Sequence, residues 1–374
     1  MKRVLHISKY YYPFRGGTEQ IAQDCLNSLM GKYEQKVICF NDKNEDQTDK
    51  IDGIEVIRCA VFKTIASQGL SRSFGKQFKT VIEDFKPDII IFHYPNPFVA
   101  YYILKYIPKT CKLAIYWHMD IVKQKFLKQF FTGQNKKLVE RADVLIATSP
   151  TYVDGSPWLS SAKDKCRVVP NCINVERLVS SPEVEAKATE IRKQNEGKMI
   201  CLAVGRHTEY KGFKYLIQTA HLLNDSFQFF ITGKGEETEN LKAEAGSDSK
   251  IHFLGLVDDV ELRAYLTAMD IFCFPSITKN EAFGLALAEG MYYGKPTVTY
   301  TISGSGVNYV SIKNVTGLEV PNRDVKAYAE ALKTLAADEE LRERLGVAGK
   351  KRVEEIFLNT QFKDNVLKVV GESL

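Results

Sequence analysis

Short apolar runs rich in β-branched and aromatic residues alternate with helix-like stretches along almost the whole chain. The apolar runs are nearly continuous, which is typical of parallel strands that helices cover on both faces. Because this alternation builds doubly wound sheets, we expect an α/β fold with two Rossmann-like parallel-sheet domains. The expected strands span residues 3–7, 36–40, 54–58, 88–92, 113–117, 144–147, 166–169, 199–204, 228–231, 251–253, 271–274, 296–299 and 317–320. The expected helices span residues 18–30, 74–85, 135–141, 213–223, 236–245, 259–268, 283–292 and 324–338.

The length of the chain makes two domains the expected arrangement. The chain has 374 residues, whereas a single hydrophobic core stops growing at about 250–300 residues. The two alternating halves meet near residues 170–178 (PNCINVERL), and a polar, charged stretch follows at 180–198. We therefore expect an N-terminal domain over residues 1–172, a C-terminal domain over residues 173–352, and a helix over residues 353–374 that packs back on the first domain.

Composition and cysteine usage favour a reduced, cytoplasmic protein. No apolar run approaches the ~20 residues that a membrane span needs. The N-terminal stretch MKRVLHISKYYYPF has too short an apolar run for a signal peptide, and it lacks a small-residue cleavage site. The 8 cysteines are scattered, with no C-x-x-C pair and no metal-ligand spacing, so we expect no metal site.

Positive charge is concentrated in the first half of the chain. Residues 1–175 contain 26 Lys and Arg against 17 Asp and Glu, a net charge of +9, whereas residues 176–374 contain 25 against 29, a net charge of −4. This asymmetry suggests that the first half meets a polyanionic surface or ligand. No recognised nucleic-acid-binding module accompanies it, so we expect no nucleic-acid partner.

One segment carries much of this charge. Between Asp120 and Glu140 there is no acidic residue, and apolar residues recur four positions apart. An amphipathic basic segment of this kind suits an anionic membrane surface, but a core-facing helix with solvated lysines explains the pattern equally well. Gly133 interrupts the segment, which predicts a helix followed by a loop. The lysines of the segment are Lys123, Lys125, Lys128, Lys136 and Lys137.

Two cations follow the first expected strand of the second half. In VGRHTEYKGFKYL, residues 204–216, the strand ends at Val204, and Arg206 and Lys211 lie in the turn before the next helix. Cations at the carboxyl end of a parallel strand suit a diphosphate, although two solvated surface charges are the commoner explanation of such a pair.

Glycines follow two other strands. Gly233 opens the turn in ITGKGE, which resembles the start of a dinucleotide fingerprint but has no third glycine, so a nicotinamide cofactor is only weakly indicated. Gly16 and Gly17 follow the first strand of the chain. Paired glycines let backbone N–H groups approach a ligand, but they also occur in ordinary turns.

Two glutamates bracket an apolar stretch in EAFGLALAE, residues 281–289. Within one helix, Glu281 and Glu289 would lie about 12 Å apart along the axis and about 80° apart around it. Acid–base carboxylate pairs in glycoside hydrolysis are about 5–9.5 Å apart, so the two residues do not form such a pair.

A helix start between the two glutamates gives them another use. We expect the helix to begin near Phe283, and its free N–H groups and dipole would attract a phosphate. Glu281 and Glu289 would then accept hydrogen bonds from sugar hydroxyls on either side of a diphosphate. The pattern alone fits equally well a helix-start residue followed by a half-buried ion-pair partner.

Taken together and in order, these motifs resemble the family 4 retaining glycosyltransferases of the GT-B fold. The resemblance covers nearly the whole chain and implies two Rossmann-like domains that face each other across a cleft. Two features depart from the family pattern: Cys172 replaces the usual linker glycine, and TYTISGSGVNYV is a variant of the donor-sugar loop. The matching motifs are Gly16-Gly17, YWHMD, PNCIN, GRHTEYKG, ITGKGE, FLGLV, E-x7-E over EAFGLALAE, and GKP.

The resemblance implies roles for the charged residues of the second half. Arg206 and Lys211 would bind the donor diphosphate and stabilise the charge of the leaving group. Glu281 would hold hydroxyls of the transferred sugar, and Glu289 would hold the ribose. Backbone N–H groups at the helix start would come from Phe283, Gly284 and Leu285.

The remaining implied contacts come from both halves. Gly233 and Val257 would lie beside the nucleotide base. Gly16 and Gly17 would approach the phosphates from the N-terminal domain. His118, at the end of the expected strand 113–117, would face the donor sugar, although a histidine there is often only structural.

The resemblance also implies chemistry without a metal or cofactor, with the two cations and the helix dipole as counter-charge. The chain contains no D-x-D motif of metal-dependent glycosyltransferases. Its closest likeness is to the branch that builds O-antigen and capsule chains, which favours GDP-mannose as donor and a saccharide or lipid-linked saccharide as acceptor. A UDP-sugar donor stays open. A peripheral position on the cytoplasmic face of the inner membrane would suit such an acceptor.

Two other classes share the expected fold or ligand. A sugar-nucleotide epimerase would form an epimer from labelled donor without any acceptor. A non-catalytic binder would bind the donor without turnover. The complete E-x7-E pattern with Arg206 and Lys211 favours a transferase.

Overall fold

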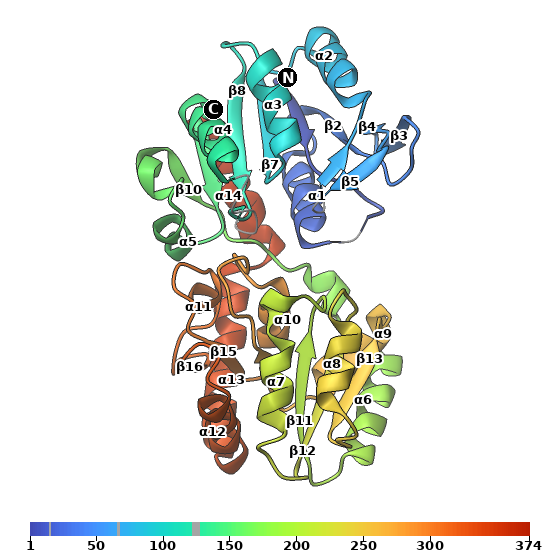
Figure 1. Ribbon diagram of the computed structural model, residues 1–374, viewed down its shortest axis with the longest axis vertical. Coiled ribbons are helices and arrows are strands. Elements are labelled where there is room, and N and C mark those ends of the chain that lie inside the picture. Colours follow the sequence, from blue (N-terminus) through green and yellow to red (C-terminus); the bar gives the residue numbers. More distant parts are fainter. Residues whose placement is uncertain (15, 66–67, 122–127) are drawn as a thin grey trace. The chain divides into compact units, whose positions relative to one another are not determined.

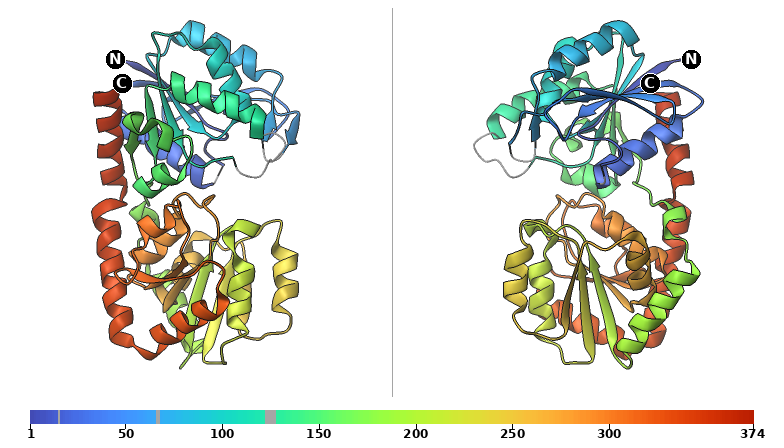
Figure 2. Two further views of the ribbon diagram at one scale, coloured as in Figure 1. Left: turned by 60° about the vertical axis from the view of Figure 1, so that its left-hand side comes forward. Right: turned by 90° about the vertical axis from the view of Figure 1, so that its right-hand side faces the viewer.

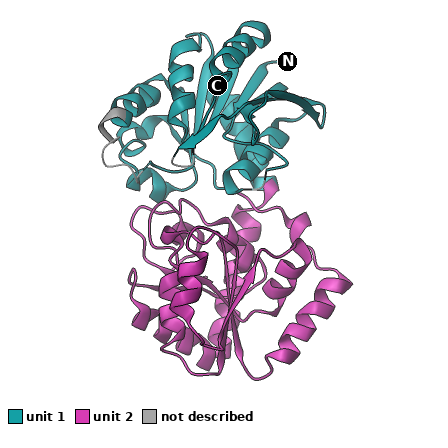
Figure 3. Ribbon diagram, turned by 45° about the vertical axis from the view of Figure 1, so that its right-hand side comes forward, with its two compact units in different colours: residues 1–171, 360–374 teal, residues 172–359 magenta. Residues whose placement is uncertain are grey.

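The computed structural model describes residues 1–14, 16–65, 68–121 and 128–374, and the side chains of residues 128–130 also lie outside the described part. The chain divides into two compact units (Figure 3). The first comprises Met1–Asn171 with Thr360–Leu374, and the second comprises Cys172–Asn359. Among the described residues, no helix is long and apolar enough to cross a membrane.

The first unit contains a twisted sheet whose strand order reverses beside its first strand (Figure 1). The described strands follow the order β10-β9-β8-β7-β1-β2-β4-β3, and all neighbours are parallel except β3 and β4. The strands are β1 (Arg3–Ile7), β2 (Glu34–Phe40), β3 (Gln47–Ile51), β4 (Ile54–Cys59), β7 (Ile89–Tyr94), β8 (Lys112–Trp117), β9 (Val144–Ala147) and β10 (Cys166–Val168), with a separate hairpin of β5 (Lys63–Ile65) and β6 (Gln68–Leu70). The helices are α1 (Gly17–Leu29), α2 (Phe74–Phe85), α3 (Pro97–Tyr106), α4 (Lys128–Arg141), α5 (Pro150–Gly155) and α14 (Asn359–Ser373).

The second unit has a fully parallel sheet in the order β13-β12-β11-β14-β15-β16. This is the doubly wound order in which the chain turns back between the first and fourth strands. The strands are β11 (Met199–Val204), β12 (Phe227–Thr232), β13 (Ile251–Gly255), β14 (Ile271–Phe274), β15 (Thr297–Tyr300) and β16 (Gly317–Val320). The helices are α6 (Pro182–Gln194), α7 (Phe213–Ala220), α8 (Thr238–Ala245), α9 (Asp259–Ala268), α10 (Leu285–Tyr292), α11 (Val307–Val310), α12 (Val325–Ala337) and α13 (Glu339–Ile356).

Helices lie on both sides of each sheet (Figure 2), so the central strands are buried on both faces. All six residues of β7 and all six of β12 are buried. Burying such continuous apolar runs supplies the main driving force for folding. The expected α/β fold with two parallel-sheet units is confirmed.

Local sequence signals fix many of the helix starts. The side chain of Ser181 accepts a hydrogen bond from Val184 N, and Pro182 opens helix α6. Asp258 caps α9, Asp324 caps α12, and Asp338 caps α13 in the same way. These caps satisfy N–H groups that the first turn of a helix leaves free.

The C-terminal boundary differs from the expected one. Helix α13 continues without a break to residue 356, so the expected boundary between residues 352 and 353 falls inside it. The returning segment of the first unit begins at Thr360 and lies in α14. Its buried residues are Phe362, Val366, Val369 and Val370, which recur at the three- and four-residue spacing of one helix face.

Candidate functional site

The carboxyl ends of β11 and β14 form the point in the second unit where the strand order reverses. These strands are neighbours in the sheet although 70 residues separate their carboxyl ends at Val204 and Phe274, and Cys201 pairs with Ile271. Open doubly wound sheets bind ligands outside the carboxyl ends of their strands at such a point. Arg206 and Lys211 lie in the loop after β11, and Glu281 lies in the loop after β14. The topology therefore gathers three of the predicted site residues.

Lys211 and Glu281 form an ion pair within this edge. Lys211 Nζ lies 2.5 Å from Glu281 Oε2, and the two side chains are only 14% and 11% exposed. Burial alone lowers the pKa of the Lys211 ammonium, but the Glu281 carboxylate and the nearby Tyr210 outweigh it and raise the pKa above its usual value. Lys211 is therefore a fixed positive charge at neutral pH.

Three further groups hold this pair in place. Lys211 Nζ lies 5.2 Å from the centre of the Phe274 ring, a distance at which the ring face attracts a cation. The hydroxyl of Ser276 donates to Glu281 Oε2 at 3.1 Å. The hydroxyl of Ser305 donates to the backbone carbonyl of Glu281. The side chain and the backbone of Glu281 are thus both anchored.

Arg206 differs from Lys211 because its side chain is exposed. Its positive charge is close enough to oppose the rise in the pKa of Lys211. The loop after β11 therefore carries two cations, one buried and paired, the other exposed to solvent.

Helix α10 begins beside this ion pair. It starts at Leu285 with Gly284 as its N-cap, about two residues later than the predicted start at Phe283. Gly284 has a φ of +98°, which disfavours any residue with a side chain, and it brings no side chain that would cap the first turn. Phe283 is buried against Phe357, so only its backbone is available to a ligand. The helix start thus offers N–H groups to an anion.

Glu289 lies in the second turn of α10 and is half-buried. Burial raises the pKa of its carboxyl to about 7, Arg177 opposes the rise, and Asp259 adds to it. Glu281, by contrast, precedes the helix. The two glutamates of the E-x7-E pattern therefore lie in different environments.

Glycines let the neighbouring loops pack closely at the same edge. Gly233 follows β12 with a φ of +122°, and a Cβ there would lie 1.9 Å from the carbonyl oxygen of Gly205. A Cβ on Gly235 would lie 2.2 Å from the carbonyl oxygen of His207. Val257 follows β13 and is partly exposed. Both predicted base-side residues, Gly233 and Val257, thus follow adjacent strands.

The predicted residues of the first unit follow two of its strands, β1 and β8. Gly16 is the N-cap of α1 and Gly17 is its first residue. His118 directly follows β8 and is only 5% exposed. Its ring lies 4.5 Å from the Tyr116 ring, and burial lowers its pKa to about 3, so His118 is neutral at physiological pH.

Sequence reasoning missed several residues that support these positions. Ser276 and Ser305 hold Glu281, and His93 lies 2.9 Å from His118, from its Nδ1 to Nε2. Ser276 and His93 each lie at or just after the end of an apolar run, which is the one signal that marks them. Nothing local marks Ser305.

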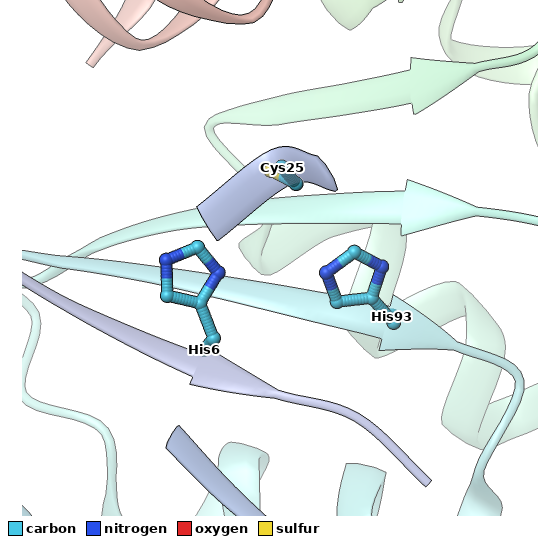
Figure 4. A group of neighbouring side chains, drawn as sticks. All are labelled: His6, Cys25 and His93. Carbon is cyan, nitrogen blue, oxygen red and sulfur yellow. The ribbon is translucent and has the colours of Figure 1, made fainter. Parts of the chain in front are cut away.

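A group of buried ligand-type side chains also escaped the sequence analysis. His6, Cys25 and His93 come from β1, α1 and β7, and their ligand atoms lie within 4.8 Å of one another (Figure 4). They are 19 and 68 residues apart in the chain, so no spacing rule reveals them. Burial raises the pKa of the Cys25 thiol to about 12, which keeps it protonated.

The basic segment is only partly described. Lys123 and Lys125 lie outside the described residues, as does the side chain of Lys128, whereas Lys136 and Lys137 are exposed. The prediction that Gly133 ends the helix is wrong, because α4 continues through it to residue 141. A Cβ at this position would meet no atom of the described residues within 4 Å, so the glycine marks no close approach to them.

Family models match both halves of the chain. The model described as Glycosyltransferase Family 4 matches residues 15–177, and the model described as glycosyl transferases group 1 matches residues 185–352. Together they cover most of both compact units, but not residues 1–14 or the returning segment that begins at Thr360.

Two curated relatives match over nearly their whole length. The D-rhamnosyltransferase WbpZ of Pseudomonas aeruginosa is 29% identical over 360 residues, which is 95% of this chain and 92% of the relative. The O-antigen chain mannosyltransferase C of Escherichia coli is 29% identical over 362 residues, which is 95% of this chain and 94% of the relative. Among solved structures, the Anabaena protein Alr3699/HepE in complex with UDP-glucose has a TM-score of 0.79 at 15% identity, over 99% of this chain and 100% of that one.

Proposed function

The chain belongs to the family 4 glycosyltransferases and has the GT-B fold, and on this basis we propose that it transfers a hexosyl group from a nucleotide-sugar to a saccharide acceptor with retention of configuration. We propose cell-surface polysaccharide synthesis as the process, because one relative matched over nearly its whole length is named an O-antigen chain mannosyltransferase. The observation that carries the proposal is the buried Lys211–Glu281 pair beside the start of α10. A fixed cation and a helix start suit a sugar diphosphate.

We assign the leaving diphosphate to Lys211 and Arg206. When the bond between the sugar C1 and the phosphate oxygen breaks, its electron pair stays on the diphosphate. The new bond joins C1 to the acceptor hydroxyl oxygen, whose proton passes to the departing diphosphate. Two cations and the backbone N–H groups of Phe283, Gly284 and Leu285 would stabilise that negative charge. Groups held in place before the reaction stabilise developing charge without reorganising. No metal or cofactor is part of this proposal.

We assign the donor sugar and ribose to the two glutamates. The described contacts of the Glu281 carboxylate, from Lys211 and Ser276, are both to Oε2. We therefore assign Oε1 to the hydroxyls of the hexose. Glu289 would hold the ribose, with Gly233 and Val257 beside the base. From the first unit, Gly16 and Gly17 would approach the phosphates, and His118 would contact the donor sugar.

The donor that we propose is GDP-mannose, with a UDP-sugar as the alternative. Mannose is the sugar named for the full-length Escherichia coli relative, whereas UDP-glucose is bound in the more distant Anabaena structure. The acceptor would be lipid-linked, and the cytoplasmic enzyme would bind the inner membrane peripherally through the basic segment around α4. Binding to anionic vesicles that is unchanged in a Lys136→Ser/Lys137→Ser variant would contradict this contact.

A thermal-shift panel of GDP, UDP and ADP with their sugars tests the donor. A ligand at about a hundredfold excess over its Kd adds about 2.7 kcal/mol to stability, which is roughly 5–10 °C in Tm for a unit of this size. We expect GDP and GDP-mannose to give the largest shift. A larger shift with UDP compounds would select the alternative donor.

The same donor, radiolabelled, then tests the reaction. We expect labelled sugar on a saccharide acceptor and no change in the donor when acceptor is left out. Formation of an epimer without acceptor would instead show an epimerase, and donor binding without turnover on any acceptor would show a binding protein.

A further inference from the structure

His93 lies directly behind His118 in the first unit, and no motif of the sequence singles it out. It belongs to β7, is only 2% exposed, and its Nδ1 lies 2.9 Å from His118 Nε2. The two rings are nearly parallel, with centres 5.2 Å apart and an angle of 14° between their planes. The contact joins the ends of two neighbouring parallel strands, where His93 pairs in register with Tyr116.

The His118 ring is held on further sides. Its backbone N–H donates to the carbonyl oxygen of Tyr94 at 3.1 Å. Its ring stacks on Tyr116, whose hydroxyl donates to the carbonyl oxygen of Val169 at 2.9 Å. A ring packed on a fixed aromatic neighbour cannot rotate without breaking these contacts. Its nitrogens are therefore kept in fixed directions.

The far side of His93 is closed. Its Nε2 has no hydrogen-bond partner among the described residues and faces His6 and Cys25 (Figure 4). His6 is itself fixed, because its Nε2 lies 2.8 Å from Gln35 Oε1. Burial lowers the pKa of both His6 and His93, so these rings are neutral and the three side chains form an uncharged layer behind His93. Among the described residues, the His93 side chain has no other hydrogen-bond partner that would draw it away from His118.

A neutral imidazole offers one donor and one acceptor nitrogen. His93 makes a hydrogen bond with Nε2 of His118, and this holds whichever of the two rings donates the shared proton. A ligand can therefore hydrogen-bond to the His118 ring only through Nδ1. Building on the role proposed above for His118, we infer that His93 is a positioning residue that holds His118 by Nε2 and presents Nδ1 to the donor sugar.

Two substitutions of His93 separate positioning from packing. The amide of asparagine reaches the position of ring Nδ1, whereas the amide of glutamine reaches that of Nε2. His93→Asn therefore keeps a polar partner for His118, and His93→Gln does not. We expect His93→Asn to keep kcat within about threefold and His93→Gln to lower kcat about tenfold to a hundredfold, as misplaced catalytic geometry does.

Two controls accompany the pair. We assign none of the contacts of the nucleoside diphosphate to His93 or His118, so its affinity should change less than about twofold in either variant. His6→Gln should lower Tm but keep kcat, because His6 belongs to the same buried layer and does not contact His118 in the structure. Equal kcat values for His93→Asn and His93→Gln, or an equal loss in His6→Gln, would overturn the positioning role.

A second measurement separates this inference from the proposed function. If the wild-type protein transfers no sugar, the proposed function fails, and the ring ¹⁵N signals of His118 still report the contact. These signals should move in His93→Gln and stay close to the wild-type values in His93→Asn. Unchanged signals in both variants would refute the contact whatever reaction the protein performs.

Discussion

The buried pair of Lys211 and Glu281 shows how much one contact contributes to this site. Removing charges from water is costly, and two buried charges offset that cost only when they are paired and hydrogen-bonded. Here the pair is 2.5 Å apart, and Ser276 donates to the same carboxylate oxygen. The loss of either partner leaves an uncompensated buried charge, so its effects on folding and on activity must be measured separately.

Lys211→Ala should lower kcat about a hundredfold or more, because it removes a charge held ready for the leaving diphosphate. It should also lower the free energy of unfolding by about 3–5 kcal/mol, because Glu281 stays buried without its partner. Steady-state kinetics at a temperature where the variant is folded, together with chemical denaturation, would measure both.

Lys214 provides a matched control for this variant. It lies three residues further on, is 60% exposed, and is 3.8 Å from Glu244. An exposed ion pair contributes about 0–1 kcal/mol, so Lys214→Ala should be nearly neutral in stability and rate. Turnover by Lys211→Ala that matches Lys214→Ala would rule out the assigned role of Lys211.

Glu289 should make stability depend on pH. Burial raises the pKa of its carboxyl in the folded chain to about 7, from 4.5 without this environment. The folded chain therefore holds the proton more tightly than the unfolded chain. This contribution to stability is complete below about pH 4.5 and is lost as the pH rises through about 7.

In Glu289→Gln, the amide that replaces the carboxyl does not titrate. We therefore expect the wild-type protein to lose stability relative to Glu289→Gln between pH 5 and pH 8. The slope should stay below about 1.4 kcal/mol per pH unit, the limit for one proton, because solvent reaches part of the side chain. Urea denaturation of both proteins at several pH values measures their free energies of unfolding. A difference between the two proteins that stays constant across the pH range would show that folding does not shift the pKa of the Glu289 carboxyl.

The elements act by bringing their carboxyl ends to one edge of a sheet. Strands β11, β12 and β14 end beside one another, and the loops that follow them carry the candidate residues. These loops fit together only because Gly233 brings no side chain between them. Its positive φ and its closeness to the carbonyl of Gly205 are both incompatible with a Cβ.

Gly233→Ala should therefore destabilise the second unit by about 2–4 kcal/mol and weaken nucleotide binding, because the β11 and β12 loops must move apart. Gly371→Ala is the control, since a Cβ on this α14 residue would meet nothing within 4 Å in the described part of the chain. That change should be neutral or stabilise by up to about 1 kcal/mol. Equal melting temperatures for the two variants would show that the loops tolerate a side chain at Gly233.

Elements that bury little apolar surface were the hardest to predict. Helix α6 buries only Val184 and Ala188, so its sequence resembles a charged linker, and the helix is recognised through its Ser181 cap and its packing on α9. Strand β3 has no buried residue, and it depends on pairing with β4. Local patterns are weak wherever neighbouring elements supply the stability.

In the whole molecule, the two alternating halves predict the division into two units. The sequence also predicts a last helix that packs back on the first domain, but not the residue at which this helix begins. The last helix belongs with Met1–Asn171 because its apolar face is buried there, with Phe362 only 1% exposed. Helix α13 ends at Ile356, and this last helix starts at Asn359. Helix ends of this kind depend on packing more than on local sequence.

The order of motifs along the chain determined the family, the α/β fold, and the loops that carry Arg206, Lys211 and the two glutamates. These features are local: continuous apolar runs, glycines after strands, and charges at strand ends. Only the tertiary structure decided that Lys211 contacts Glu281 across 70 residues, that Ser305 anchors Glu281, and that His93 holds His118. The physical reason is that the strand order places β11 beside β14 and β7 beside β8. Contacts between strand ends depend on this order and on the register of the strands, and no local sequence pattern encodes either.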